Sequence, residues 1–173
     1  MGKAEIASTQ KDEILERNII EELGSLALAT RLKNLSERLA KDVAAIYKES
    51  DFDFEPRWFA VVYALKNGEE LAVTELAASL QQTHPAVNQV ANILVKKKLV
   101  IESKDEFDQR KRLLKLSDTG IELVGKMEGL WLKIKKANDQ LLIDSKQNFL
   151  DDIKTIESAL DQKSMYDRVK SLL

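Results

Sequence analysis

The chain has 173 residues, no cysteine and one histidine, and its formal net charge is −2 at pH 7. Without cysteine it has no disulfide, thiolate nucleophile or thiol-based oxidant sensor, and a zinc site is not expected because such sites draw on Cys and His. No run approaches the roughly 20 apolar residues that span a bilayer, and the N-terminus lacks a signal peptide's apolar stretch. We therefore expect a cytoplasmic protein without a membrane partner, built from long helices since glycine and proline are scarce.

The N-terminal part predicts one long helix. Residues 1–10 show no apolar period and are expected to be disordered. A helix is expected over residues 11–50, with a bend near Gly24. Its apolar residues recur at spacings of three and four, namely Ile19, Ile20, Leu23, Leu28, Leu32, Leu35, Leu39, Val43, Ile46 and Tyr47. Because so long a stripe exceeds what a small domain can cover, we expect much of it to meet a partner chain.

An aromatic junction follows, in which DFDFEPRW precedes a helix expected over residues 55–66. Asn67-Gly68 would end this helix in a left-handed turn. Two interpretations stay open here. The aromatic residues form a hydrophobic plug, or they form the wall of a candidate effector pocket with Phe54, Arg57, Trp58 and Tyr63. A cationic side chain beside aromatic rings suits an anionic aromatic ligand.

Residues 71–98 predict a helix-turn-helix. Thr74 is the expected N-cap of the first helix and Thr83 that of the second, with Pro85 in the first turn. On the second helix, four apolar residues repeat at core spacing: Val87, Val90, Ala91 and Leu94. The opposite face carries His84, Ala86, Asn88, Gln89 and Asn92. Asn and Gln suit adenine, although such a face is equally typical of an ordinary amphipathic helix.

A charged β-hairpin is expected next. Residues 99–103 and 112–116 are strand-like and bracket a tip from Lys104 to Lys111 that has little to bury. Residues 82–115 hold eight Lys or Arg and four Asp or Glu, a net charge of +4, which leaves −6 for the rest of the chain. A basic patch inside an acidic protein indicates a face that binds phosphate.

Three further helices are expected after the hairpin. The first begins at Ser117 or Asp118 and runs to about residue 142, the second begins at Ser145, and Ser164 caps a short final helix. Their apolar surface exceeds the need of a lone extension, so with the first helix they predict a dimerisation unit. Heptads are not sustained, which excludes a simple coiled coil.

The hairpin and the helix before it also carry a family resemblance. Asp108-Gln109-Arg110, then Arg112 and LKLSDTG, together with THPAVNQVANILVKKKLV, resemble the DNA-binding domain of the multiple antibiotic resistance regulator (MarR) family over about residues 55–125. The chain departs from the family pattern at three positions. Ser117 replaces Thr, Lys98 stands where the family usually has Gly, and Gln89 stands where Arg is frequent.

The resemblance implies a fold and roles for residues. The fold would be a mainly α winged helix-turn-helix with a small β-hairpin wing and long N- and C-terminal dimerisation helices. Arg110 would enter the minor groove, Asp108 would hold the wing in shape, and the polar face of the second helix would meet the major groove. Relatives dimerise through their terminal helices and bind effectors near the aromatic junction.

Together these observations predict a homodimeric, DNA-binding transcription regulator on a roughly palindromic operator, with no enzymatic activity, cofactor or metal. Repressors are the more frequent case among relatives, and relief by a small-molecule effector is expected. The expected parts are a disordered start (1–10), an N-terminal dimerisation helix (11–54), the winged helix (55–120) and C-terminal dimerisation helices (121–173). The expected DNA contacts are Thr83, His84, Ala86, Asn88, Gln89, Asn92, Lys96, Lys97, Lys104, Asp108, Arg110, Lys111 and Arg112. The alternative is a winged-helix adaptor that binds protein and has no operator.

Overall fold

The computed structural model describes residues 18–144 and 148–173. The disorder expected for residues 1–10, the start of the first predicted helix and the predicted helix start at Ser145 lie outside the described residues. The chain divides into two compact units, Met1–Lys115 and Leu116–Leu173. Within the described residues, no helix is long and apolar enough to cross a membrane.

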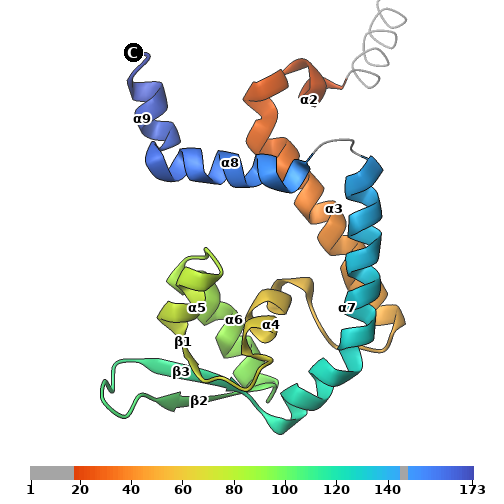
Figure 1. Ribbon diagram of the computed structural model, residues 1–173, viewed down its shortest axis with the longest axis vertical. Coiled ribbons are helices and arrows are strands. Elements are labelled where there is room, and N and C mark those ends of the chain that lie inside the picture. The colour runs from red at the N-terminus through yellow and green to blue at the C-terminus, as the bar shows by residue number, and fades with distance from the viewer. Residues whose placement is uncertain (1–17, 145–147) are drawn as a thin grey trace, which may run out of the picture. The chain divides into compact units, whose positions relative to one another are not determined.

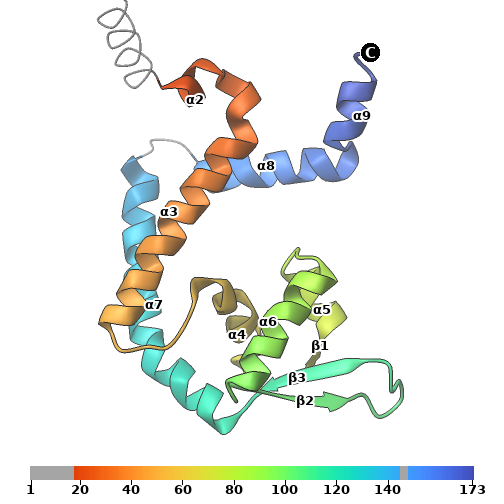
Figure 2. The same cartoon turned by 180° about the vertical axis from the view of Figure 1, so that it is seen from behind.

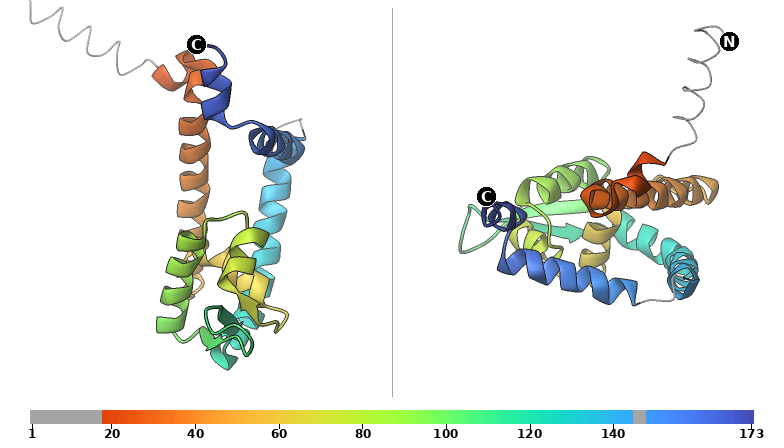
Figure 3. Two further views of the ribbon diagram at one scale, coloured as in Figure 1. Left: turned by 90° about the vertical axis from the view of Figure 1, so that its left-hand side faces the viewer. Right: turned by 90° about the horizontal axis from the view of Figure 1, so that it is seen from above.

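The first unit opens with separate helical segments instead of one continuous helix. α2 (Ile19–Glu22) is followed by the short 3₁₀ helix η1 (Gly24–Ala27) and then by the long, straight α3 (Leu28–Glu49), seen from the side in Figure 3. Gly24 has a φ of +53°, so the predicted bend near this residue is confirmed. Five large apolar side chains of α3 are 36–43% exposed, namely Leu28, Leu32, Leu35, Leu39 and Ile46.

The aromatic junction joins α3 to the winged helix. The helix predicted over residues 55–66 consists of a 3₁₀ turn, η2 (Pro56–Trp58), and a short helix, α4 (Phe59–Leu65). Tyr47, Phe54 and Trp58 are buried and pack edge to face, with centroid distances of 5.3 and 5.5 Å. This geometry is favourable for aromatic pairs, and the three rings form part of the core.

The predicted winged helix-turn-helix is confirmed. β1 (Leu71–Ala72), α5 (Val73–Ser79), α6 (His84–Lys96), β2 (Val100–Lys104) and β3 (Arg112–Leu116) follow in order. The sheet has the strand order β1-β3-β2, with Leu71 paired to Leu114 in an antiparallel register. In Figures 1 and 2, α5 and α6 lie together on one side of this sheet, and the hairpin of β2 and β3 projects beyond them as the wing.

Two details of α5, the first helix of the helix-turn-helix, differ from the prediction. The N-cap of α5 is Ala72 and not Thr74, because the carboxylate of Glu75 accepts a hydrogen bond from the Ala72 N–H at 2.8 Å. Ala72 also lies in β1, which the sequence analysis did not predict. Glu75 thus satisfies the N–H of the N-cap residue, and no hydroxyl caps this helix.

α6, the second helix of the helix-turn-helix, follows the prediction closely. The Thr83 hydroxyl accepts from the Ala86 N–H at 3.4 Å, and Pro85 lies in the first turn. The predicted core positions Val87, Val90, Ala91 and Leu94 are all buried. The apolar face of α6 is thereby packed inside the domain, and its polar face is left outside.

Three helices end at left-handed residues that are not glycine. Asp51, Gln81 and Lys98 have φ values of 58°, 51° and 61° and follow α3, α5 and α6. At α6 the Leu99 N–H donates to the Leu94 carbonyl, and the Lys98 N–H donates to the Val95 carbonyl, both at 2.9 Å. These two bonds form a Schellman motif. A left-handed residue with a Cβ costs about 1–2 kcal/mol, and the buried Leu94 and Leu99 offset this cost.

The second unit is helical beyond the end of β3. It holds α7 (Asp118–Asp144), α8 (Phe149–Gln162) and α9 (Met165–Lys170). The Ser117 hydroxyl accepts from the Gly120 N–H at 3.0 Å, and the Ser164 hydroxyl accepts from the Asp167 N–H at 3.1 Å, so both predicted caps are confirmed. Figure 1 shows α9 turning away from α8. The Arg168 Nε donates to the Lys163 carbonyl at this corner, at 2.9 Å.

Replacing Lys98 with Gly tests the left-handed turn. We expect Lys98→Gly to stabilise the protein by about 0.5–1 kcal/mol, because relief of the left-handed strain exceeds the extra backbone entropy of glycine in the unfolded chain. The measurement is the urea unfolding midpoint at one fixed protein concentration. Gln89→Gly in the middle of α6 is the matched control and should destabilise by about 0.5–1 kcal/mol. A loss of stability in Lys98→Gly would show that this turn is unstrained.

Candidate nucleic-acid interface

The polar face of α6 is open to solvent. Thr83, His84, Ala86, Gln89 and Asn92 are exposed, and Asn88 is half-buried. All belong to α6 or its N-cap, and the burial of the opposite stripe holds them outward. The structure thus places the predicted major-groove residues on a single surface that carries hydrogen-bond donors and acceptors.

The wing tip is built by hydrogen bonds instead of a core. The Asp105 carboxylate accepts from the N–H groups of Phe107 and Asp108 at 2.9 and 2.7 Å, and the Asp108 carbonyl accepts from the Lys111 N–H at 2.8 Å. Such aspartate-centred turns need no apolar partner. Phe107 is accordingly 94% exposed. The tip is therefore ordered locally, and its side chains project into solvent.

Asp108 positions Arg110. One carboxylate oxygen of Asp108 accepts from the backbone N–H of Arg110 at 3.1 Å and from its Nε at 3.0 Å. The side-chain hydrogen bond from Arg110, followed by the backbone one, holds the pKa of the Asp108 carboxyl below its ordinary value. The Arg110 side chain is nevertheless 92% exposed. It is oriented by Asp108 while its guanidinium stays accessible.

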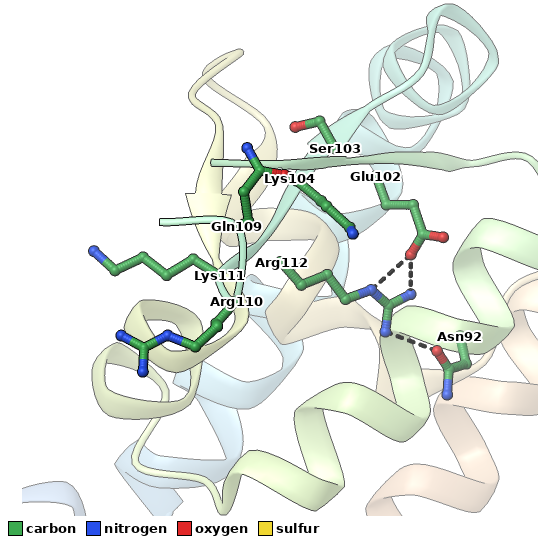
Figure 4. Close-up of a pocket in the computed structure, with 8 residues that line it drawn as sticks. All are labelled: Asn92, Glu102, Ser103, Lys104, Gln109, Arg110, Lys111 and Arg112. Carbon is green, nitrogen blue, oxygen red and sulfur yellow. Dashed lines mark hydrogen bonds and ion pairs between the residues drawn. The ribbon is translucent and has the colours of Figure 1, made fainter. Parts of the chain in front are cut away.

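Arg112 points the other way and is held within the protein. Its Nε donates to Glu102 at 2.6 Å, and its Nη1 donates to the amide oxygens of Asn88 and Asn92 at 2.6 and 2.8 Å. Its Nη2 forms an ion pair with the same Glu102 carboxylate. Figure 4 shows this guanidinium turned toward Glu102 and Asn92, whereas Arg110 and Lys111 extend away from it. The predicted phosphate contact thus lies in a network that links β2, β3 and α6.

A hollow of about 650 Å³ lies between the wing and α6. Its walls are Asn92, Glu102, Ser103, Lys104, Gln109, Arg110, Lys111 and Arg112. Lys104 and Lys111 form no ion pair with any residue that the structure describes. Their ammonium groups are available to anionic groups of a ligand.

Lys97 at the end of α6 also has a partner within the first unit. Its ammonium forms an ion pair with Asp53 and lies 5.1 Å from the centroid of the Trp58 ring. Sequence spacing gives no signal for either contact, because 44 residues separate Lys97 from Asp53. The residue predicted to contact phosphate therefore also joins the C-terminal end of α6 to the aromatic junction.

The four residues of the candidate effector pocket do not share one environment. Phe54 and Trp58 are buried, whereas Arg57 and Tyr63 are exposed. Arg57 donates to the Glu55 carboxylate at 2.6 Å. The Trp58 indole N–H is buried and has no hydrogen-bond partner within the described part of the chain. An unpaired buried donor of this kind costs about 1–3 kcal/mol.

Comparison with known proteins supports the family resemblance. Residues 52–111 match the family model of the MarR family. Curated protein sequences contain no match to the chain.

Solved structures share the fold. A MarR/EmrR family transcriptional regulator from Acinetobacter sp. ADP1 has a TM-score of 0.64 and 18% identity, covering 80% of this chain and 97% of its own. The transcriptional repressor CouR bound to a 23-mer DNA duplex has a TM-score of 0.62 and 22% identity, covering 78% and 96%. The S. aureus MepR–DNA complex has a TM-score of 0.59 and 18% identity, covering 79% and 97%.

The Asp108–Arg110 bond predicts how the wing responds to acid. The bond favours the charged carboxylate, so the pKa of Asp108 is lower in the folded protein than the unfolded value near 3.8. Its stabilisation of the wing is therefore complete above 3.8 and is lost as the pH falls through the folded pKa. The Arg110 Nε–H resonance in NMR should therefore shift as the pH is lowered, with a midpoint below 3.8. The Asp108→Asn variant supplies the baseline without this step. A midpoint above 3.8 in the unmodified protein would contradict the assignment.

Proposed function

We propose that the protein is a sequence-specific DNA-binding transcription regulator of the MarR type that acts as a homodimer, on the premise that residues 52–111 match the model of that family. One observation carries the proposal. The exposed polar face of α6 lies beside a wing whose Arg110 is held out by Asp108 and is 92% exposed. Because the wing tip has no apolar core and exposes Arg110, we assign the wing to DNA binding and not to stabilising the fold.

In the proposed complex, α6 occupies the major groove. Thr83, His84, Ala86 and Gln89 face base edges together with the two asparagines of the helix. Arg110 enters the neighbouring minor groove, where negative potential attracts a guanidinium. Lys96, Lys104 and Lys111 contact phosphates, which sets affinity and register but not sequence preference. The net charge of +4 over residues 82–115 supports this face, and not the acidic remainder of the chain, as the surface that binds DNA.

The homodimer forms through the terminal helices. The exposed apolar stripe of α3 and the exposed Leu150, Ile156 and Leu160 of α8 supply the surface. A two-fold dimer carries two copies of α6, so the operator is roughly palindromic with half-sites about one helical turn apart. An operator occupied in this way excludes other proteins from the same DNA, so we propose repression in the cytoplasm.

A small-molecule effector would act at the aromatic junction. An anionic group could replace Asp53 beside Lys97, and an acceptor could satisfy the buried Trp58 N–H, which has no partner among the described residues. Lys97 is the C-cap of α6, so a change in its partners would reach the DNA-binding helix. Relief of repression then follows from a shift of α6.

Selection of bound duplexes from a random pool tests the DNA-binding function with Arg110→Ala. The unmodified protein should enrich a palindrome, and a fluorescence titration should show Kd rising about tenfold to a hundredfold in Arg110→Ala. The thermal midpoint should not change because this side chain is exposed. Lys41→Ala on α3 is the control for loss of one charge and should bind like the unmodified protein. Equal Kd values for Arg110→Ala and the unmodified protein would exclude the proposed role of the wing, and no enrichment at all would favour a protein-binding adaptor.

A substitution on the α3 stripe tests the dimer. Leu35→Glu places a charge on the exposed apolar face and should weaken self-association at least tenfold, since burying an unpaired carboxylate is costly. Asn34→Glu adds the same charge to an exposed position on another face of α3 and should leave association unchanged. Sedimentation equilibrium over a range of concentrations measures both. Equal association constants for the two variants would place the interface elsewhere.

A further inference from the structure

Arg112 uses most of its hydrogen-bonding capacity inside the protein. A guanidinium has five N–H donors and no acceptor. Glu102 accepts from Nε at 2.6 Å and pairs with Nη2, which fixes the plane of the group and offsets its charge. The two hydrogens on Nη1 then point toward α6, where they meet Asn88 and Asn92. The Arg112 side chain is only 28% exposed, whereas its partner Glu102 is 48% exposed.

The donors of Arg112 decide which way the two amides face. Asn88 and Asn92 are four residues apart on α6 and so lie on one face of the helix. Because Arg112 can only donate, each asparagine must direct its oxygen toward the guanidinium. The oxygens accept at 2.6 and 2.8 Å. The NH₂ groups are therefore turned away from Arg112, and each amide presents donors instead of a donor and an acceptor.

This orientation changes what the helix can recognise. An asparagine reads adenine by accepting from N6 and donating to N7, which requires both ends of a free amide. An amide whose oxygen is already occupied can still donate to acceptors in the major groove. Those acceptors are N7 and O6 of guanine and O4 of thymine, with adenine offering only N7. Guanine, which offers two acceptors where thymine and adenine each offer one, then becomes the preferred partner.

We propose that Arg112 is a specificity-determining positioning residue, which clamps Asn88 and Asn92 so that these two amides donate to guanine and do not make the paired contact with adenine. The inference rests on the proposed function and deepens it. Arg112 itself contacts neither base nor phosphate in this arrangement. It acts from β3, through the two amides, on a helix that is 20 to 24 residues away in sequence.

The experiment compares base preferences of three proteins by selection from one random duplex pool. In Arg112→Met the amides are free to rotate, so adenine should gain about five- to a hundredfold at one or two positions of each half-site, the range of a bidentate pair. Lys111→Met is the matched control. It removes one charge from the neighbouring position, whose side chain extends away from Arg112 (Figure 4). It should weaken binding to all sequences alike and leave the preferences unchanged.

Asn92→Asp provides a second variant that keeps the clamp. The carboxylate still accepts from Arg112 and, being charged, holds it more tightly, so the thermal midpoint should not fall. It has no NH₂ group, so discrimination at the base position facing residue 92 should be lost. A purely structural role for Arg112 would lower the thermal midpoint of Arg112→Met without moving any base preference.

The outcomes separate this inference from the function on which it rests. A palindrome with guanine at the positions read by Asn88 and Asn92, replaced by adenine in Arg112→Met, supports the clamp. The same palindrome with identical base preferences in Arg112→Met and the unmodified protein overturns the clamp alone. Failure of the unmodified protein to enrich any sequence overturns the proposed function and the clamp together.

Discussion

Burial of one side of α6 is the constraint on which the rest of the site depends. Val87, Ala91 and Leu94 are essentially inaccessible to solvent, and their removal from water fixes the rotation of the helix about its axis. Successive residues of a helix differ by about 100°, so a shift of one position would turn the buried stripe partly toward solvent. With the rotation fixed, Asn88 and Asn92 face the wing, and Arg112 can reach both.

The parts of the fold that follow from local periodicity were predictable. The limits of α6, its threonine cap and its buried stripe come from spacing within a single segment, and the hairpin comes from two apolar runs around a charged tip. β1 was not predictable in this way. It has two residues and exists because Leu71 pairs with Leu114, a contact that no local pattern encodes. The predicted cap of α5 was wrong for a related reason, since the helix begins at Val73, directly after β1, and Thr74 therefore lies inside it.

The turns after three helices show tertiary burial overriding local preference. Glycine is the usual signal for a left-handed helix end because it lacks a Cβ. Asp51, Gln81 and Lys98 occupy such positions instead. Sequence comparison with the family identifies Lys98 as an exception, but only the structure shows that the turn keeps its geometry. Leu94 and Leu99, buried on either side of it, can be in place only if the chain reverses there.

Counting charges found the basic region but could not divide its members by role. All eight Lys and Arg residues in the range 82–115 contribute equally to the net charge. The structure separates them by partner. Arg110 is oriented yet exposed, Lys104 and Lys111 have no ion-pair partner in the described ranges, and Arg112 is neutralised by Glu102.

The paired cations hold α6 from two directions. Arg112 ties the exposed face of the helix to the wing through Asn88 and Asn92, and Lys97 ties its C-terminal end to Asp53 and the Trp58 ring. The C-terminal end of α6 is thereby tied to the aromatic junction, while its exposed face is tied to the wing. A displacement at the aromatic junction would therefore reach the two amides that are proposed to contact DNA. In the proposed mechanism, an effector bound at the junction would therefore alter base recognition through α6 itself.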